Sequence, residues 1–168
     1  MDHESKDVDG WIIRDSEENF ETWISKDFVS DSLRDKLKKA DILIVPIESL
    51  NDRNIPLFPQ GTENLFVFLN KNLPENLNVD ICIEDNDYKE LTLHFDLVTI
   101  ASFVVKSMAL PFLINLLSNY IYQKISHFKS RNVKVSITIV NEIGQSKNLS
   151  YEGSIDGFTK IIEQLKKK

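Results

Sequence analysis

The sequence is poor in cysteine, because Cys82 is the only one among 168 residues. A single thiol excludes an internal disulfide and a zinc cage built from cysteines. Gly-rich phosphate loops, GxSxG and HExxH motifs, heptads and internal repeats are also absent. The opening residues MDHESKDVDG contain no apolar run that would form a secretory signal. These absences predict a cytoplasmic protein without a cofactor, with a mobile acidic tail over residues 1–10 and a single domain over 11–168.

Basic residues are in the minority, with 20 Lys and Arg against 26 Asp and Glu and a formal net charge of −6. Nucleic-acid binders normally present a basic face, so we expect no nucleic-acid partner. The charge is uneven: Met1–Asp35 holds eleven acidic and four basic residues, whereas Gln123–Lys168 holds four acidic and nine basic ones. The two regions are either solvated surfaces of opposite sign or a docking surface for a charged partner. Sixteen Lys against four Arg indicates a bacterial source with an AT-rich genome.

The longest apolar stretch, Phe95–Ile125, is interrupted by polar residues at helical spacing. Pro111 lacks an amide hydrogen, so the spacing predicts two amphipathic helices, 96–110 and 111–127, with a break near Met108–Pro111. This pair would fill the core of the domain. The alternative is a membrane anchor through 97–122, in which Lys106 would cost about 2.5–3.5 kcal/mol at a bilayer centre.

The remaining apolar patterns predict strands and one terminal helix. Ile42–Ile47 is short, β-branched and apolar on both faces, as in a central strand. Alternating apolar residues predict two hairpins, one joining 77–84 to 88–95 and one joining 133–139 to 147–151 through a turn at Gly144. A final helix follows with Ser154 as its N-cap. Further helices are expected near residues 17–24, 32–40 and 64–73, the last with Thr62 as its cap.

This order of elements predicts an α+β fold with two layers. We expect a mostly antiparallel sheet made of the two hairpins and one central strand, packed on the long broken apolar helix pair.

The polar face of the first predicted hairpin is the best candidate for chemistry. In the expected register it collects Asp80, Glu84, Glu90 and His94, together with Cys82. Carboxylates beside a histidine can bind a divalent metal or act as an acid–base pair. Neighbours on one strand face lie almost 7 Å apart, however, and no further ligand or nucleophile is evident. A solvated outer face of the sheet explains the same residues.

The favoured hypothesis is a non-enzymatic interaction or regulatory subunit of a bacterial multiprotein system. Its partner would be another protein or a second copy, recognised by the basic residues Lys124, Lys129 and Arg131 around an apolar centre at Ile55, Leu57 and Phe58. Burial of the three apolar residues in the chain's own core is the competing interpretation. The alternative functions are a small metal-dependent hydrolase or nuclease that uses the acidic hairpin face, and a membrane-associated protein.

Overall fold

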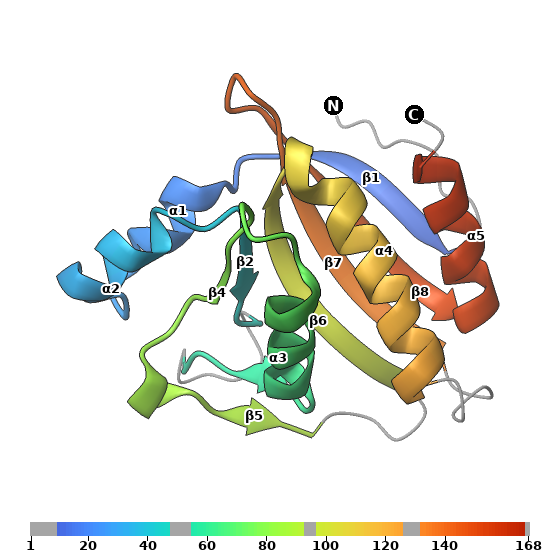
Figure 1. Ribbon diagram of the computed structural model, residues 1–168, viewed down its shortest axis with the longest axis horizontal. Coiled ribbons are helices and arrows are strands. Elements are labelled where there is room, and N and C mark those ends of the chain that lie inside the picture. Colours follow the sequence, from blue (N-terminus) through green and yellow to red (C-terminus); the bar gives the residue numbers. More distant parts are fainter. Residues whose placement is uncertain (1–9, 48–54, 93–96, 126–131, 167–168) are drawn as a thin grey trace.

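The computed structural model describes residues 10–47, 55–92, 97–125 and 132–166 (Figure 1). The strands are β1 (Trp11–Ser16), β2 (Ile42–Val45), β3 (Phe58–Pro59), β4 (Val79–Ile81), β5 (Glu90–Leu91), β6 (Leu97–Lys106), β7 (Asn132–Val140) and β8 (Ser146–Ser154). The α-helices are α1 (Phe20–Ile24), α2 (Asp31–Leu37), α3 (Thr62–Asn72), α4 (Leu110–Tyr120) and α5 (Ile155–Lys166). Shorter helical turns are η1 (Asp85–Asp87), η2 (Ser107–Ala109) and the π-helical η3 (Ile121–Ile125).

Six strands form one mixed sheet in the order β1-β8-β7-β6-β2-β4. Two neighbouring pairs, β6 with β7 and β2 with β4, are parallel, and each is joined through a helix, α4 and α3 respectively. The other neighbours are antiparallel. The short strands β3 and β5 form a separate parallel pair. The predicted fold is therefore wrong in its architecture: the sheet is mixed, it is not built from two hairpins, and no long helix pair covers it within the described residues.

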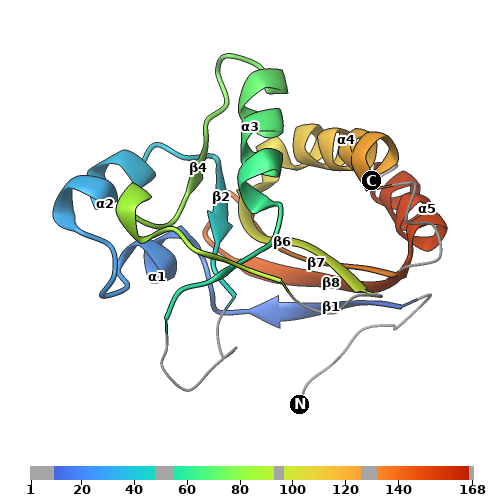
Figure 2. The same ribbon diagram turned by 90° about the horizontal axis from the view of Figure 1, so that it is seen from below.

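The sheet separates two apolar cores. Helices α3, α4 and α5 cover one face, and α1 and α2 lie on the other side near β2 (Figure 2). Alternation along β2 and β6 divides their side chains between the two cores. Ile42, Ile44, Phe103 and Val105 belong to the larger core, and Leu43, Val45 and Val104 belong to the smaller one. Both strands are thus buried on both sides, which explains their nearly continuous apolar sequences.

The first half of the predicted helix pair is the strand β6. The polar residues Thr99, Ser102 and Lys106 mimic helical spacing for two reasons. A shift of register between Thr99 and Ala101 breaks the alternation of the strand. Val104 is apolar on the otherwise polar side because it packs into the smaller core. The β-branched composition of LVTIASFVVK favours the strand that forms.

The second half of the pair is helix α4, which begins at Leu110 with Pro111 in its first turn. A proline at this position loses no intrahelical hydrogen bond and supplies a favourable φ angle. The predicted break near Met108–Pro111 exists, but it joins a strand to a helix. No helix in the described part of the chain is both long enough and apolar enough to cross a membrane.

The first predicted hairpin is also wrong. Its apolar residues do face the core, since Leu77, Val79 and Ile83 are buried. However, β4 is only three residues long and pairs in parallel with β2, and β5 pairs with β3. Alternation fixes which side of a strand is buried, but it does not identify the neighbouring strand.

Three predicted elements are confirmed. β2 is a fully buried interior strand. β7 and β8 form an antiparallel hairpin in which Gly144 has a φ angle of 89°. The Ser154 hydroxyl accepts a hydrogen bond from the Gly157 amide at 3.0 Å, as an N-cap of α5 should.

Candidate functional site

The predicted acidic face does not assemble, because its residues serve separate structural contacts. Asp80 on β4 forms an ion pair with Lys36 at 3.7 Å. Burial raises the pKa of Asp80 and outweighs the opposing effects of Lys36 and of the Ile81 amide. Glu84 accepts a hydrogen bond from the Ser30 hydroxyl, next to the start of α2.

Glu90 lies on β5, where it contacts the beginning of α3, and His94 lies outside the described residues. Within the described ranges, no three His, Cys, Asp or Glu side chains lie close enough together to hold a metal ion. The Cys82 thiol is buried, and desolvation raises its pKa to about 12. Such a thiol is almost entirely protonated at neutral pH and is a poor nucleophile.

The three residues predicted to form the apolar centre of a partner surface differ in how far they are buried. Phe58 is fully buried and stacks on Tyr88, so it is unavailable to a partner in this structure. Leu57 is half-buried and forms a bridge with Ile47, and Ile55 is 38 % exposed. Of the basic residues, Lys124 belongs to η3 with only its backbone described, and Lys129 and Arg131 lie outside the described residues.

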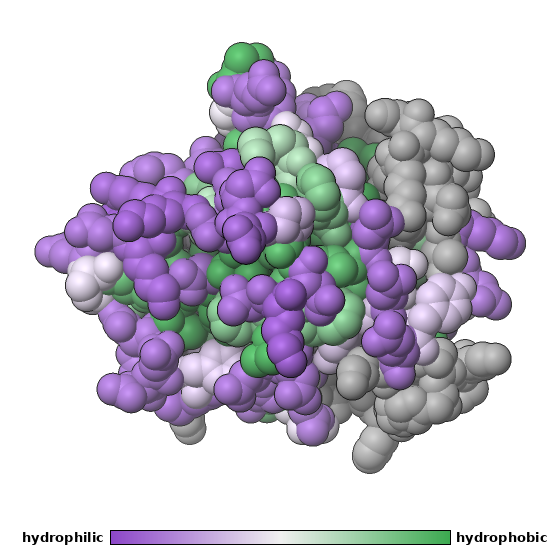
Figure 3. Space-filling model, in the orientation of Figure 1, coloured by the Kyte–Doolittle hydropathy of each residue, from purple (hydrophilic) through white to green (hydrophobic). Residues whose placement is uncertain are grey.

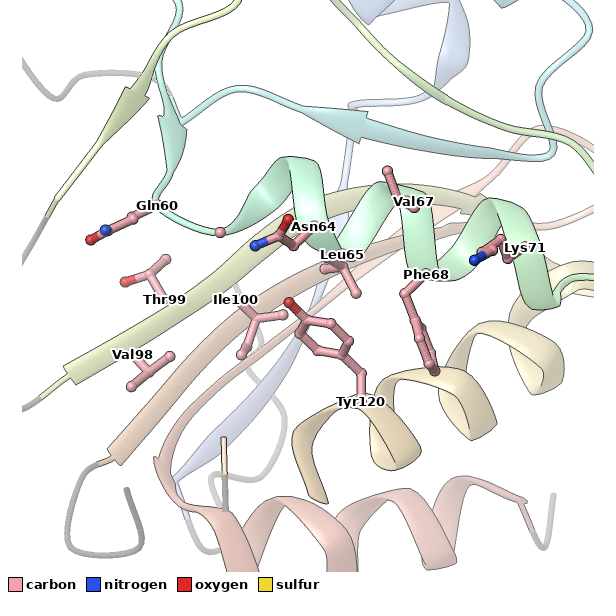
Figure 4. Close-up of a pocket in the computed structure, with 11 residues that line it drawn as sticks. Gln60, Asn64, Leu65, Val67, Phe68, Lys71, Val98, Thr99, Ile100 and Tyr120 are labelled. Atoms are coloured by element: carbon pink, nitrogen blue, oxygen red, sulfur yellow. The ribbon is translucent and has the colours of Figure 1, made fainter. Parts of the chain in front are cut away.

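A cavity of about 640 Å³ opens between α3, the beginning of β6 and the end of α4 (Figure 4). Its walls are mostly apolar side chains, with polar groups at the two ends and at the centre. The lining residues are Gln60, Gly61, Asn64, Leu65, Val67, Phe68, Lys71, Val98, Thr99, Ile100 and Tyr120. This size and this mixture of wall residues are typical of small-molecule sites.

A register shift in β6 lies at the end of the strand that lines this cavity. In a regular strand, successive side chains point to opposite faces. Because the shift lies between Thr99 and Ala101, the consecutive residues Ile100 and Ala101 both belong to the larger core. β-Bulges of this kind re-aim side chains and are frequent next to functional sites.

Two hydroxyl groups on the elements around the cavity have no hydrogen-bond partner among the described residues. Tyr120 is only 8 % exposed, and Figure 4 shows its hydroxyl directed from α4 toward Leu65 and Ile100. No described residue forms a hydrogen bond with this hydroxyl. Thr99 Oγ1 is inaccessible to solvent and is likewise without a partner in the described part of the chain. Only Thr99 Oγ1 is a buried polar atom without a partner among the described residues, and the register opposite the exposed Lys134 places its side chain on the face of the sheet turned away from α3 and α4.

The N-terminus of α3, beside the cavity, is already occupied by a carboxylate. Glu90 accepts hydrogen bonds from the amides of Gly61 (3.0 Å) and Glu63 (3.1 Å) and from the Tyr88 hydroxyl (2.6 Å). Burial opposes the charge on Glu90, but these three donors together lower its pKa. Tyr120 has a raised pKa, first because of its burial and second because of the charge on Glu90, so its hydroxyl stays protonated.

A second feature is the solvent side of α4, which we call the α4 face. Met108, in the turn η2 just before the helix, is 58 % exposed, Phe112 is 44 % exposed, and Leu116 is half-buried one turn further on. The spacing of four residues places Phe112 and Leu116 along one side of α4. Helix α4 contains no charged residue, and the only polar side chains on this side are Asn115 and Asn119. Figure 3 shows apolar surface over the N-terminal half of α4.

The sequence reasoning missed both features, although the sequence holds a signal for the α4 face. Residues 97–141 contain five basic residues and no acidic one, in a chain with an overall negative charge. The cavity has no comparable signal, because its walls come from α3, β6 and α4, which are brought together only by the fold.

Comparison of the chain with protein-family models, with curated proteins and with solved structures finds no match. The class of protein is therefore defined by the fold and the site alone: an α+β domain with a mixed six-stranded sheet, a cavity at one end of β6 and an uncharged apolar helix face.

Proposed function

We propose that the chain is a non-enzymatic interaction or regulatory subunit of a bacterial multiprotein system, and that it binds another protein through the α4 face. The observation that carries this proposal is the exposure of Met108 in η2 and of Phe112 in α4, a helix without charged residues. Centres of protein interfaces are depleted of charge and enriched in aromatic residues and Met. Phe112 is the side chain best suited to act as the anchor in a pocket of the partner.

The charge of the partner is inferred from the basic residues close to α4 in sequence. The acid-free segment 97–141 contains both strands that flank α4 in sequence, β6 and β7. Lys106 is engaged by Asp41 at 3.3 Å, which leaves Lys124, Lys129 and Arg131 after α4 as the basic residues nearest to it in sequence. Interfaces place complementary charges at the rim around an apolar centre. The occupant we propose is therefore a protein with an acidic rim around an apolar pocket.

The test is purification of the tagged chain from its native host in three forms. These forms are the parent, the double variant Met108→Asp/Phe112→Asp, and the matched control Ile55→Asp. Both variants place a charge on an exposed apolar position, so both are expected to keep the thermal unfolding midpoint of the parent. We expect one protein to copurify in stoichiometric amount with the parent and with Ile55→Asp, and to be absent from the double variant.

Two results would overturn the proposal. If the copurified protein is lost with Ile55→Asp and kept with the double variant, the contact lies at the loop before β3. If light scattering shows that the purified chain alone is a dimer, and that only the double variant is a monomer, the α4 face is occupied by a second copy and not by an acidic partner.

A further inference from the structure

The turn between β7 and β8, residues 141–145, carries an inference about the same protein contact, and this inference rests on the function proposed above. The turn protrudes from the end of the sheet (Figure 1), and Figure 3 shows apolar atoms at its tip next to hydrophilic surface. Ile143 is 77 % exposed, more than any other large apolar side chain in the described part of the chain. Turn positions favour Gly, Asn, Asp and Ser, so an exposed isoleucine here adds nothing to folding through burial.

Single apolar residues are common on protein surfaces, but the position of Ile143 is fixed by a network of hydrogen bonds. Asn141 Oδ1 accepts hydrogen bonds from the backbone amides of Ile143 at 3.0 Å and of Gln145 at 2.9 Å. The Asn141 amide donates to the Gln145 carbonyl at 2.9 Å, and the Gly144 amide donates to the Asn141 carbonyl at 3.1 Å. The turn is therefore preorganised, so binding through it loses little conformational entropy.

The turn and the beginning of the α4 face lie at the same end of the sheet. Lys106, the last residue of β6, pairs with Val140, the last residue of β7. Met108 follows β6 by two residues at this end, and the turn follows β7 directly. Figure 1 shows both at the same end of the sheet. A protein seated on Met108 and Phe112 is therefore in a position to contact the turn as well.

A hollow of about 460 Å³ lies at the base of the turn, where Asp15, Ile139 and Lys147 are among its lining residues. These three residues lie opposite one another on β1, β7 and β8, so their side chains share one side of the sheet. Ile139 packs against the larger core, which is the core under α3, α4 and α5 (Figure 2). The hollow is therefore on the same side of the sheet as the α4 face.

The surface around the turn is acidic. Asp15 and Glu17 line the hollow and Glu142 belongs to the turn, and all three are exposed. The one basic residue among the lining residues is Lys147. Lys124, by contrast, lies in η3 after the other end of α4. An acidic surface repels the anionic lipids of a membrane, so these charges favour a protein that is basic where it meets the turn.

We propose that Ile143 inserts into an apolar pocket of the protein that binds the α4 face, and that the rim of this pocket is basic. A Lys or Arg side chain of the partner enters the hollow and meets Asp15 and Glu17. The same partner is acidic where it approaches Lys124, at the other end of α4. Because the reversed orientation would bring like charges together, this polarity allows one orientation of the partner along α4.

The experiment uses the protein that copurifies with the tagged full chain and is lost from Met108→Asp/Phe112→Asp. Calorimetry measures its affinity for the parent, Ile143→Ser and Ile143→Leu. We expect Ile143→Ser to weaken binding by about tenfold or more, the effect of removing an apolar anchor, and Ile143→Leu to weaken it much less. Ile55→Ser, at another exposed isoleucine, is the matched control and should leave the affinity unchanged. All of these side chains are exposed, so the thermal midpoint should stay that of the parent.

Photocrosslinking tests the chemistry of the pocket. A photoreactive amino acid at position 143 of the full chain should crosslink to the copurified protein. Mass spectrometry of the crosslinked peptide should place the contact in an apolar segment that has Lys or Arg close to it. A contact segment rich in Asp and Glu would overturn the basic rim.

Three further outcomes would overturn the proposal, and they separate it from the proposed function. Equal affinity of the parent and Ile143→Ser overturns the inserted anchor and leaves the contact through the α4 face in place. Retention of the copurified protein by Met108→Asp/Phe112→Asp, or the absence of any such protein, overturns the proposed function and this inference with it. Flotation of the parent, but not of Ile143→Ser, with phosphatidylglycerol vesicles would assign the turn to a membrane surface.

Discussion

Two threonines on neighbouring strands differ in whether their hydroxyls are bonded. Thr99 Oγ1 on β6 is buried without a partner among the described residues. Thr138 on β7 is also buried, but its Oγ1 accepts a hydrogen bond from Asn148 Nδ2 at 3.0 Å. A buried polar atom without a partner costs about 1–3 kcal/mol, whereas a satisfied one is roughly neutral or favourable. The same substitution should therefore have opposite effects at the two positions.

We predict that Thr99→Val stabilises the protein by about 1 kcal/mol and that Thr138→Val destabilises it by about 1 kcal/mol. Valine keeps the shape and the strand preference of threonine, so the hydroxyl is the main difference. Denaturant unfolding of the two variants and the parent measures both changes. Destabilisation by Thr99→Val would mean that this hydroxyl already has a bonding partner in the folded chain.

At the scale of elements, α3 receives its N-terminal cap from a distant strand. Its N-cap residue is Gly61, which has no side chain to accept a hydrogen bond, and the Glu90 carboxylate on β5 takes that role. The Thr62 hydroxyl, next to the N-cap, does not cap the helix and donates instead to the Pro59 carbonyl at 2.6 Å. Only the fold brings residue 90 to the start of a helix at residue 62.

Glu90→Gln should destabilise the protein by about 1 kcal/mol at neutral pH, because a carboxylate accepts two amide hydrogen bonds here and an amide group offers one oxygen. The pKa of Glu90 is lowered in the folded state from its ordinary value of 4.5. Its contribution to stability is therefore complete above that ordinary value and is lost as the pH falls through the lower folded pKa. The difference between parent and variant should shrink in the same range.

Chemical denaturation at pH 7 and at several values below pH 4.5 checks this prediction. Glu75→Gln is the control, since Glu75 is exposed and makes no hydrogen bond or ion pair within the described residues. A difference between Glu90→Gln and the parent that stays constant from pH 7 to the acid range would contradict the assignment of the cap.

The elements that the sequence predicts are those with local determinants. The β7–β8 hairpin has two alternating strands joined by a short turn with Gly144, and α5 has Ser154 and a regular apolar stripe. Strand β6 was misread because its register shift and its two buried faces gave helical spacing of Thr99, Ser102 and Lys106. Those causes lie in other parts of the chain, namely α1, α2 and β7. The prediction of an acidic hairpin face is wrong for the same reason, because the pairing of each strand depends on the whole sheet.

At the scale of the whole molecule, the separation of charge gives a prediction for association kinetics. Replacement of Lys124, Lys129 and Arg131 by Ser should slow binding to the partner and flatten its dependence on salt concentration. Charges at the rim of an interface act mainly on the association rate and contribute little to folding. The thermal midpoint should therefore stay nearly unchanged. Stopped-flow measurements with the purified partner at low and high salt provide the test.

A matched control removes the same charge elsewhere. Lys38, Lys39 and Lys89 are exposed and form no ion pair with another described residue. Their replacement by Ser should slow association much less than replacement of the first set. Equal rates for the parent and both triple variants at low salt would show that the basic segment is only solvated surface.

The pairing of β1 with β8 connects the two ends of the described chain, since Trp11 lies opposite Tyr151. During synthesis at about 5–20 residues per second, the partner of Trp11 is made roughly 7–28 seconds after Trp11 itself. The edge strand β1 therefore cannot pair with β8 until the other described strands have been translated. Addition of β1 to the sheet is thus a late event of biosynthesis, although β1 itself is synthesised early.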